Sequence, residues 1–203
     1  MPRTRLTRRT KRRDPEDAKA RILEAALALF AAEGVSVPTS RIAKEAGVSE
    51  GLIFHHYGNK RGLLAAVAAH MGHGVASAMF EGILPGQRPD VRRMIRACFD
   101  YVGKKGKLHD MLAMSNDPAD WNAAQLATRG VIVAALTQAF TQWKAAGYIE
   151  TDHPDIAAAL IFGLVDAALL DCFSRGLEDR VDEYIEEAVA CIEGALGYEG
   201  PNA

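Results

Sequence analysis

The chain has 203 residues, of which 49% are hydrophobic and 25% are charged, the composition of an ordinary globular protein. Alanine is abundant and no useful run of alternating β-forming residues occurs, which favours an all-helical fold. Three cysteines without a CxxC pair argue against a disulfide framework or a zinc ribbon. No apolar signal-peptide core follows the basic N-terminus, and the longest apolar run, residues 156–165, is too short to span a bilayer. We therefore expect a soluble, cytoplasmic protein that does not associate with membranes.

The formal net charge of −2 is the sum of two oppositely charged parts of the chain. Residues 1–62 carry 13 Lys and Arg against 7 Asp and Glu, a net charge of +6. Residues 63–203 carry 11 against 19, a net charge of −8. A basic head on an acidic body indicates an anionic partner that contacts only the head. For the basic arm alone, residues 1–13, a disordered solubilising tail is the alternative interpretation.

The first three predicted helices form a recognisable arrangement. Asp14-Pro15 begins the first, with Asp14 as the cap, and the helix ends near Gly34. The second begins at residues 38–40 and is ended by Gly47, and Ser49 caps the third. Two short helices joined by an Ala-Gly-Val-Ser turn within about twenty residues predict a helix-turn-helix.

The third helix is crowded with apolar, aromatic and imidazole side chains. We expect an inward set that anchors the helix: Ile42, Val48, Ile53 and Tyr57. The residues left outside are candidates for the DNA major groove, with Leu52 on a thymine methyl and His55 and His56 donating to bases or phosphates. Adjacent histidines on a helix point about 100° apart, so this pair is a poor metal chelate.

The stretch AKEAGVSEGLIFHHYGNKRGLL resembles the signature of the TetR (tetracycline-repressor) family, closely over residues 18–65. The matching residues are Ala46, Gly47, Val48, Ser49, Gly51, His56, Lys60 and Leu63. The resemblance implies that Lys60 opens a helix on a DNA phosphate and that His56 lies at the DNA backbone. The expected DNA-contacting set is Arg12, Arg13, Thr39, Ser40, Arg41, Ser49, Glu50, Gly51, Leu52, His55, His56, Tyr57 and Lys60.

Three departures from the family signature affect this expectation. Phe54 stands where the family usually has a tyrosine, so the hydroxyl contact with phosphate is missing. Leu52 replaces a frequent threonine. The segment between Gly34 and Ile42 is about one residue shorter than usual, which leaves open which of residues 39–41 meets phosphate.

Six further helices are expected in the body, which makes about nine in all. They run from Lys60 to the Pro85-Gly86 stop, from Pro89-Asp90 to about Lys105, and over 107–115, 117–144, 153–175 and 181–196. We divide the chain into a basic arm (1–13), a helix-turn-helix domain (14–62) and an effector-binding and dimerisation domain (63–203).

The last two helices carry a candidate dimer interface. Small residues recur every four positions in one helix, and the other has an apolar stripe opposite its acidic face. Packing within the chain is the alternative interpretation; the family resemblance instead implies a four-helix bundle with a symmetry mate and a palindromic operator. The candidate interface residues are Ala159, Gly163, Ala167, Tyr184, Ala188 and Ile192.

Methionines indicate where an effector binds. Apart from Met1, all five lie within residues 71–114, the region from which family pockets are largely built, although plain core filling is the alternative. Asp166 interrupts an apolar stretch and needs a partner. The expected effector-binding set is Met79, Met94, Cys98, Met111, Met114, Trp121, Gln125, Arg129, Phe162 and Asp166. Further effector-contacting candidates are the polar residues His70, His73, His109 and Asn116 and the apolar residues Phe80 and Phe99. His70 and His73 are also spaced like a pair of metal ligands, but no third ligand lies nearby in the sequence.

The expected function is a ligand-responsive, homodimeric transcriptional repressor that a hydrophobic or amphipathic molecule releases from double-stranded DNA. No nucleophile elbow, phosphate-binding glycine loop or HExxH motif occurs, so we expect neither an enzyme nor a cofactor. The alternative is an architectural or effector-independent DNA-binding protein.

Overall fold

The computed structural model describes residues 15–83, 87–104 and 117–198. These residues form eight α-helices and no strand, which confirms the all-α fold. The ninth helix, expected over 107–115, lies outside the described residues. The helices are α1 (Pro15–Glu33), α2 (Thr39–Ala46), α3 (Glu50–Tyr57), α4 (Lys60–Phe80), α5 (Val91–Lys104), α7 (Pro118–Ala145), α8 (Pro154–Ser174) and α9 (Val181–Leu196), with a 3₁₀ turn η1 (Glu178–Arg180) before α9.

Most helix ends follow the predicted capping residues. Gly47 ends α2 with a φ of 63°, and the Asp117 side chain accepts a hydrogen bond from the Ala119 amide at 2.8 Å at the start of α7. Ser49 occupies the predicted N-cap position of α3, although its side chain makes no capping hydrogen bond. One expectation was wrong. Helix α4 ends at Phe80 and not at the Pro85-Gly86 stop, because Gly82 turns the chain with a φ of 70°.

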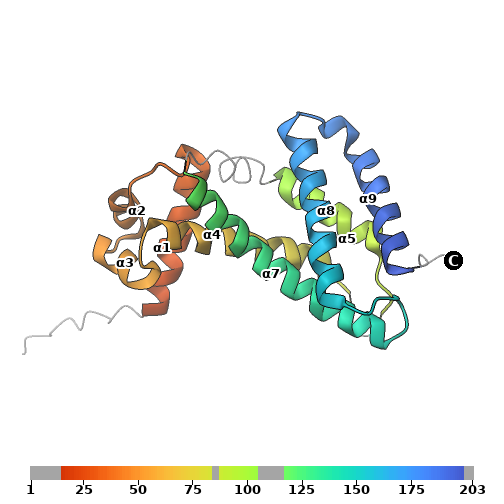
Figure 1. The fold of residues 1–203 in the computed structure, drawn as a ribbon. Coiled ribbons are helices and arrows are strands. Elements are labelled where there is room, and N and C mark those ends of the chain that lie inside the picture. The colour runs from red at the N-terminus through yellow and green to blue at the C-terminus, as the bar shows by residue number, and fades with distance from the viewer. Residues whose placement is uncertain (1–14, 84–86, 105–116, 199–203) are drawn as a thin grey trace, which may run out of the picture.

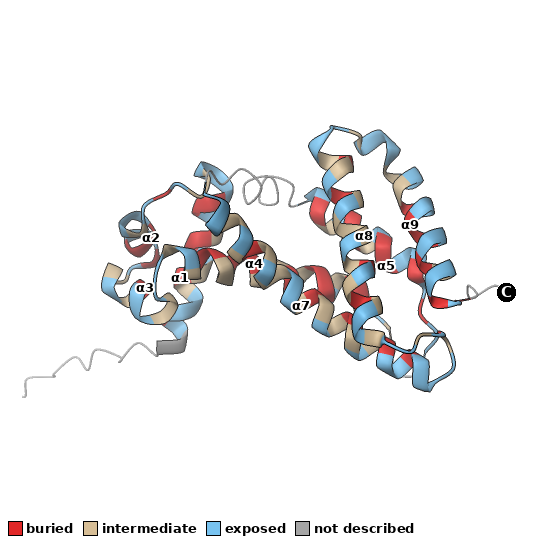
Figure 2. Ribbon diagram, viewed as in Figure 1, coloured by how far each residue is buried: buried red, intermediate tan, exposed pale blue. Residues whose placement is uncertain are grey.

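Figure 1 shows an elongated molecule with a head of α1–α3 at one end and a body containing α5, α8 and α9 at the other. Helices α4 and α7 run from the head into the body. Each end has its own buried core, as the red segments in Figure 2 show. The head core contains Ile22, Phe30, Ile42 and Ile53, each 0% exposed.

The head core also includes parts of α4 and α7. The first two turns of α4 supply Leu63 and Val67, and α7 supplies Ala124, which is 2% exposed. Further along, the Thr128 hydroxyl of α7 donates to the Ala68 carbonyl of α4 at 3.1 Å. The head is therefore packed against both long helices.

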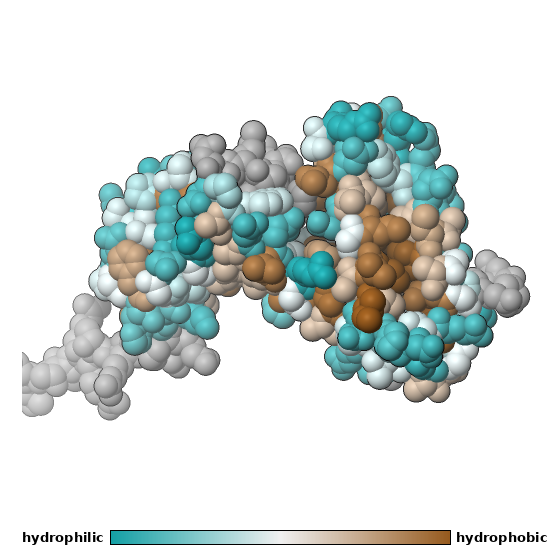
Figure 3. Space-filling model, viewed as in Figure 1, coloured by the Kyte–Doolittle hydropathy of each residue, from teal (hydrophilic) through white to brown (hydrophobic). Residues whose placement is uncertain are grey.

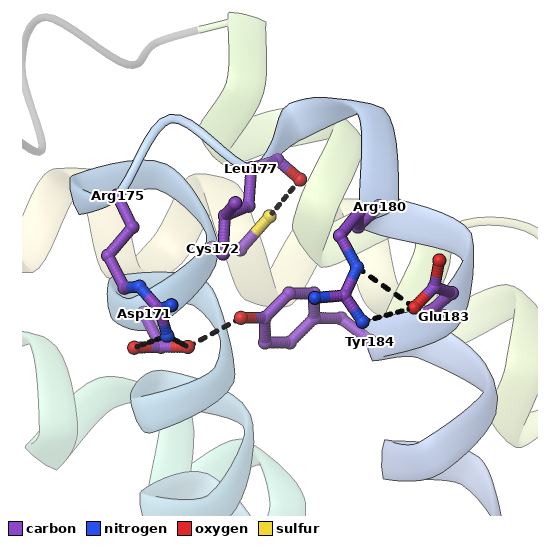
Figure 4. A network of polar contacts seen from close by, with 7 residues as sticks. All are labelled: Asp171, Cys172, Arg175, Leu177, Arg180, Glu183 and Tyr184. Carbon is purple, nitrogen blue, oxygen red and sulfur yellow. Dashed lines mark hydrogen bonds and ion pairs between the residues drawn. The ribbon is translucent and has the colours of Figure 1, made fainter.

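The corner between α8 and α9 is held by a polar network (Figure 4). The Asp171 carboxylate accepts a hydrogen bond from the Tyr184 hydroxyl and pairs with Arg175. The Cys172 thiol donates to the Leu177 carbonyl at 3.4 Å, and Arg180 pairs with Glu183. These contacts connect the end of α8 with the start of α9, so they restrain the angle between the two helices.

By length and composition alone, α4 and α8 are each apolar enough to cross a membrane. Half of the apolar window of α4 is buried within the chain, as in the core helix of a soluble protein, but only 22% of that of α8 is buried. Three large apolar side chains of α8 are exposed: Ile156 (52%), Leu160 (69%) and Leu170 (38%).

Candidate nucleic-acid interface and effector cavity

Helix α3 lies on the outer side of the head, and its inner face is fixed by packing (Figure 1). Ile53 and Ile42 are fully buried, and Val48 and Tyr57 pack against the head core, so all four residues of the expected inward set are confirmed. The Tyr57 hydroxyl donates to the Lys19 carbonyl at 2.9 Å. Tyr57 was also expected to contact DNA, but this bond ties its polar end to α1.

A second link holds the turn between α2 and α3. The Arg21 side chain of α1 donates from Nη1 to the Ala46 carbonyl at 2.9 Å, in a partly buried position. This bond satisfies one of the carbonyl groups left unpaired at the end of α2. The helix-turn-helix is therefore held in place by α1.

The outer face of α3 presents three exposed positions in its first two turns: Gly51, Phe54 and His55. Phe54 is 43% exposed, whereas Leu52 is half-buried. Phe54 was missing from the set expected from the sequence. Its helical spacing from Gly51 was a signal that could have found it, because residues three apart share a helix face.

The two residues flanking this face from α2 are engaged within the head. The Thr39 hydroxyl donates to the Glu50 carboxylate at 2.5 Å, which couples α2 to the first turn of α3. Arg41 pairs with Glu33 at 2.7 Å in an exposed position. Ser40 and Ser49 are exposed on the same part of the head.

The two histidines differ in their surroundings. His55 is exposed, and its ring lies edge-on to that of His56 with centroids 5.3 Å apart. Nε2 of His56 is buried and has no hydrogen-bond partner in the part of the chain that the structure describes. Among the described residues no group of three or more His, Cys, Asp and Glu side chains is placed to hold a metal.

Helix α4 begins at the edge of this surface with a close turn. Asn59 caps it by accepting a hydrogen bond from the Gly62 amide at 2.9 Å. Partial burial lowers the pKa of Lys60, an effect that the nearby Asp120 carboxylate opposes. Arg61 pairs with Asp117 at 3.0 Å and with Asp120 at 2.8 Å, both in the first turn region of α7. The first turn of α4 is therefore joined to α7 by a forked ion pair.

Two of the expected contact residues, Arg12 and Arg13, lie outside the described residues. The positive charge of the head resides in that same region. Residues 1–14 hold seven of the thirteen basic residues and one of the seven acidic residues of 1–62, which leaves six of each in 15–62. The described head, residues 15–62, thus has a formal net charge of zero. Long-range attraction of an anion such as DNA therefore depends on the basic arm.

The body encloses a cavity of about 110 Å³ between α4, α5, α7 and α8, with two residues of α9. Its walls are almost entirely apolar, and Asp166 is the one charged residue among the described residues that line it. Seven residues of the expected effector set line the cavity: Met79, Met94, Cys98, Trp121, Gln125, Phe162 and Asp166.

The remaining effector candidates do not line this cavity. Arg129 is exposed and lies over the Phe162 ring, with its guanidinium carbon 5.7 Å from the ring centroid. His70 and His73 are exposed. The Phe80 ring packs against Trp143, and the Phe99 ring packs against Phe173. Met111, Met114, His109 and Asn116 lie outside the described residues. The sequence set missed Tyr101, Thr128 and Trp143, which line the cavity.

The candidate dimer residues lie in two different environments, at the surface in α8 and within the chain's own fold in α9. Gly163 and Ala167 are exposed and Ala159 is half-exposed on α8, next to the exposed Leu160. Figure 3 shows a hydrophobic patch over this part of the body. Ala188 and Ile192 of α9 are each 4% exposed and lie in the core of their own chain, and Tyr184 is bonded to Asp171. The exposed small residues of α9 are instead Ala190, Cys191, Gly194 and Ala195.

Comparison with known proteins links this architecture to a family. A model of the bacterial regulatory proteins of the tetR family matches residues 22–67, which run from within α1 to the first two turns of α4. The HTH-type transcriptional repressor SCO4008 of Streptomyces coelicolor is 52% identical over 56 residues, 27% of this chain and 29% of that protein. This match therefore spans less than a third of the relative's length.

Two further proteins are similar over most of the chain. The HTH-type transcriptional repressor AcnR of Corynebacterium glutamicum is 26% identical over 187 residues, 90% of this chain and 94% of that protein. The structure of SmeT, the repressor of the Stenotrophomonas maltophilia multidrug efflux pump SmeDEF, in complex with triclosan shares the fold with a TM-score of 0.60 at 18% identity, over 88% of this chain and 90% of that one. Residues 22–67 therefore carry the helix-turn-helix domain of the tetR family of bacterial regulatory proteins, a family of transcriptional regulators and not of enzymes, and the similarity to a transcriptional repressor extends over most of the chain.

Proposed function

We propose that this regulator is a homodimeric repressor that binds a palindromic operator and is released by a hydrophobic small molecule. The observation that carries the proposal is the anchoring of α3. Its inner face is fixed by Ile53 and the Tyr57–Lys19 bond, while Gly51, Phe54 and His55 face outward. A helix held in this way can enter a major groove without rearranging the head.

The dimer in this proposal forms through the exposed face of α8. Leu160 and Ile156 are large apolar side chains in water, and Gly163 and Ala167 leave room for a second helix to approach. No described heavy atom lies within 4 Å of the position that a Cβ on Gly163 would take. A second copy related by two-fold symmetry covers this face with the same face, since such an interface is self-complementary. Two-fold symmetry then places two α3 helices on two half-sites.

The effector in this proposal acts through α7. Trp121 and Ala124 line the cavity and also contact the head core, and Thr128 lines the cavity and bonds to α4. Arg61 joins the start of α7 to the first turn of α4. A ligand that displaces the beginning of α7 therefore shifts α4 and the head together. Coupling between two such sites typically amounts to about 1–3 kcal/mol, or roughly 5–150-fold in DNA affinity.

The chemistry of the cavity supports a largely apolar effector. Methionine side chains, such as Met79 and Met94, adapt to differently shaped apolar molecules. SmeT, which shares the fold, is seen in complex with triclosan. Gln125 and Asp166 supply the polar positions that would orient an apolar molecule in the cavity of this chain.

The decisive experiment is selection of bound duplexes from a random pool with the full chain, followed by sequencing. A dimeric repressor enriches a palindrome with half-sites about one helical turn apart. Retention of DNA without an enriched sequence would contradict the proposal and favour the architectural alternative, in which the basic arm provides the contact.

A second experiment tests the effector. The chain has two tryptophans, Trp121 and Trp143, and both line the cavity, so intrinsic fluorescence reports directly on occupancy. A panel of small aromatic and acyl compounds is titrated, and those that change the emission are then added to the protein–operator complex. Occupancy of the cavity without any change in operator affinity would contradict the proposed release mechanism.

A further inference from the structure

One aromatic side chain on the outer face of α3 is unlike every other large apolar residue of the described head. Phe54 is 43% exposed, whereas the other large apolar side chains there are buried or half-buried. Phe54 makes none of the aromatic ring contacts found between His55, His56 and Tyr57. An isolated exposed apolar side chain is common on protein surfaces. Whether Phe54 has a role in binding therefore has to be judged from its position relative to its neighbours.

Phe54 has a glycine on each side along the chain. Gly51 precedes it by three residues on the same face of α3, a spacing that places side chains one above the other, and Gly58 lies directly after the end of the helix with a φ of 75°. Apart from the adjoining residues and the backbone of the helix itself, no described atom lies within 4 Å of the position that a Cβ would take at Gly51 or Gly58. The ring therefore stands between two positions where the backbone is bare. A surface that approaches α3 can reach close to its backbone on both sides of the ring.

The chemistry of the ring restricts what it can read in a major groove. Phenylalanine has no donor or acceptor, so it cannot recognise the hydrogen-bonding edge of any base. Thymine is the one base that presents a methyl group in the major groove, and apolar side chains contact it there. Leu52, the residue expected from the sequence to make this contact, is half-buried and lies on a different side of the helix.

We infer that Phe54 recognises the 5-methyl group of a thymine in each operator half-site. The inference rests on the proposed function, because it requires α3 to enter the major groove. The bare backbone at Gly51 and Gly58 admits the DNA, and the ring covers the methyl group. Phe54 thus acts as a specificity-determining residue that selects thymine at one position through apolar contact and not through a hydrogen bond.

The test uses the operator obtained by selection with the full chain. Each thymine of a half-site is replaced in turn by deoxyuridine, which lacks only the methyl group, and the dissociation constant is measured for each duplex. One thymine is expected at which the replacement weakens binding about fourfold per half-site, since loss of one buried methyl group corresponds to about 0.8 kcal/mol. The Phe54→Ala variant is expected to bind the thymine and uridine duplexes equally at that position.

The matched control is Leu52→Ala, which is expected to keep the preference for thymine over uridine. Circular dichroism confirms that both variants are folded. If the native protein binds its operator but no uridine replacement matters, or if Phe54→Ala retains the preference, the inference about Phe54 is wrong while the repressor proposal stands. If no operator is selected at all, the proposed function and the inference fail together.

Discussion

The three cysteines lie in three different environments, and their reactivity is expected to differ accordingly. Burial in the apolar body raises the pKa of the Cys98 thiol to about 12. Burial first, and then the carboxylates of Glu178, Asp171 and Asp179, raises the pKa of Cys172. Cys191 is exposed on α9. Only the thiolate reacts with alkylating reagents, so a raised pKa and burial both slow the reaction.

We predict that iodoacetamide at pH 8 modifies one cysteine of the native protein, Cys191, and all three in denaturant. Mass spectrometry of peptides identifies the modified residues. Rapid modification of Cys98 in the native state would mean that the wall of the cavity opens readily, contrary to its close packing.

A glycine in the first turn of α4 allows that helix to pass close to the end of α3. A Cβ added to Gly62 would lie 2.0 Å from the Tyr57 carbonyl oxygen, a backbone atom that cannot rotate away. We predict that Gly62→Ala destabilises the protein by about 1–3 kcal/mol, the usual cost of overpacking, and weakens operator binding. Thermal unfolding and a DNA-binding titration measure the two effects.

The matched control for this substitution is Gly130→Ala. Gly130 is an exposed residue within α7, and no described heavy atom lies within 4 Å of its built Cβ. Alanine there is expected to raise stability by about 0.5–1 kcal/mol, because glycine is the poorer helix former. If Gly62→Ala and Gly130→Ala had the same thermal stability and operator affinity, the backbone around Gly62 would have to adjust easily to a side chain.

At the scale of the elements, the α8–α9 corner predicts a pH dependence. Hydrogen bonding to Tyr184, and then to Arg175, lowers the pKa of Asp171 below its ordinary value of 3.8. A carboxyl whose pKa is lowered on folding stabilises the folded state above its unfolded pKa, and this contribution is lost as the pH falls through the folded pKa. We predict that Tyr184→Phe lowers Tm at pH 7 and that the difference from the native protein shrinks below pH 3.8.

The control is the same substitution in an Asp171→Asn background. There the carboxylate is absent, so Tyr184→Phe should change Tm by an amount that does not depend on pH between 3 and 7. A difference that persists unchanged at low pH in the native background would show that the tyrosine acts through packing alone.

Comparison of elements shows what the sequence can and cannot predict. Helix starts at Asp117-Pro118 and ends at Gly47 were predictable because one residue imposes the local geometry. The end of α4 was placed too late, because the proline rule overlooked Gly82, which turns the chain first. The inward set that anchors α3 was predicted, but Phe54 was not, because the family signature has a tyrosine there whose hydroxyl contacts phosphate, a contact that phenylalanine cannot make.

The apolar stripe of α9 illustrates a different limit. Ala188 and Ile192 have the spacing of an interface, but an interface within a chain and one between chains have the same helical period. The structure packs both residues into the body core, where α5 also contributes. An apolar stripe with helical periodicity shows that one face of a helix is covered. It does not show whether the covering helix belongs to the same chain or to a partner.

At the scale of the whole molecule, the exposed face of α8 predicts the oligomeric state. We expect Leu160→Glu to convert a dimer to a monomer, because it places a charge at the centre of the proposed apolar interface in both copies. Sedimentation equilibrium measures the change. Leu126→Glu is the matched control, since Leu126 is also 69% exposed but lies in the first half of α7. Dissociation by both substitutions, or by neither, would contradict an interface centred on α8.

The distribution of charge predicts how salt affects DNA binding. Residues 1–13 carry seven positive charges, and the described head is electrically balanced. We predict that a variant lacking residues 1–13 still selects the same operator, but with weaker binding and a shallower dependence of log K on log salt. The slope becomes shallower by about 0.9 for each DNA phosphate that the shortened protein no longer neutralises. Titrations at several salt concentrations measure it, and an unchanged slope would show that the arm does not touch the DNA.

The position of Ala124 has a consequence for how such regulators diversify. The family model that matches this chain ends at residue 67, yet the core beneath the helix-turn-helix is closed by an alanine that comes 57 residues later in the chain, in α7. In a chimaera that joins this head to the body of another regulator, the residue at position 124 of the head core therefore comes from the other protein. A side chain larger than alanine at that position would overpack the head core, to which Leu63 and Val67 also belong, and a glycine would leave a gap. Exchange of the DNA-binding head between related regulators is thus expected to give a folded protein where the residue equivalent to 124 is small. One position in the body therefore restricts which heads are compatible with that body.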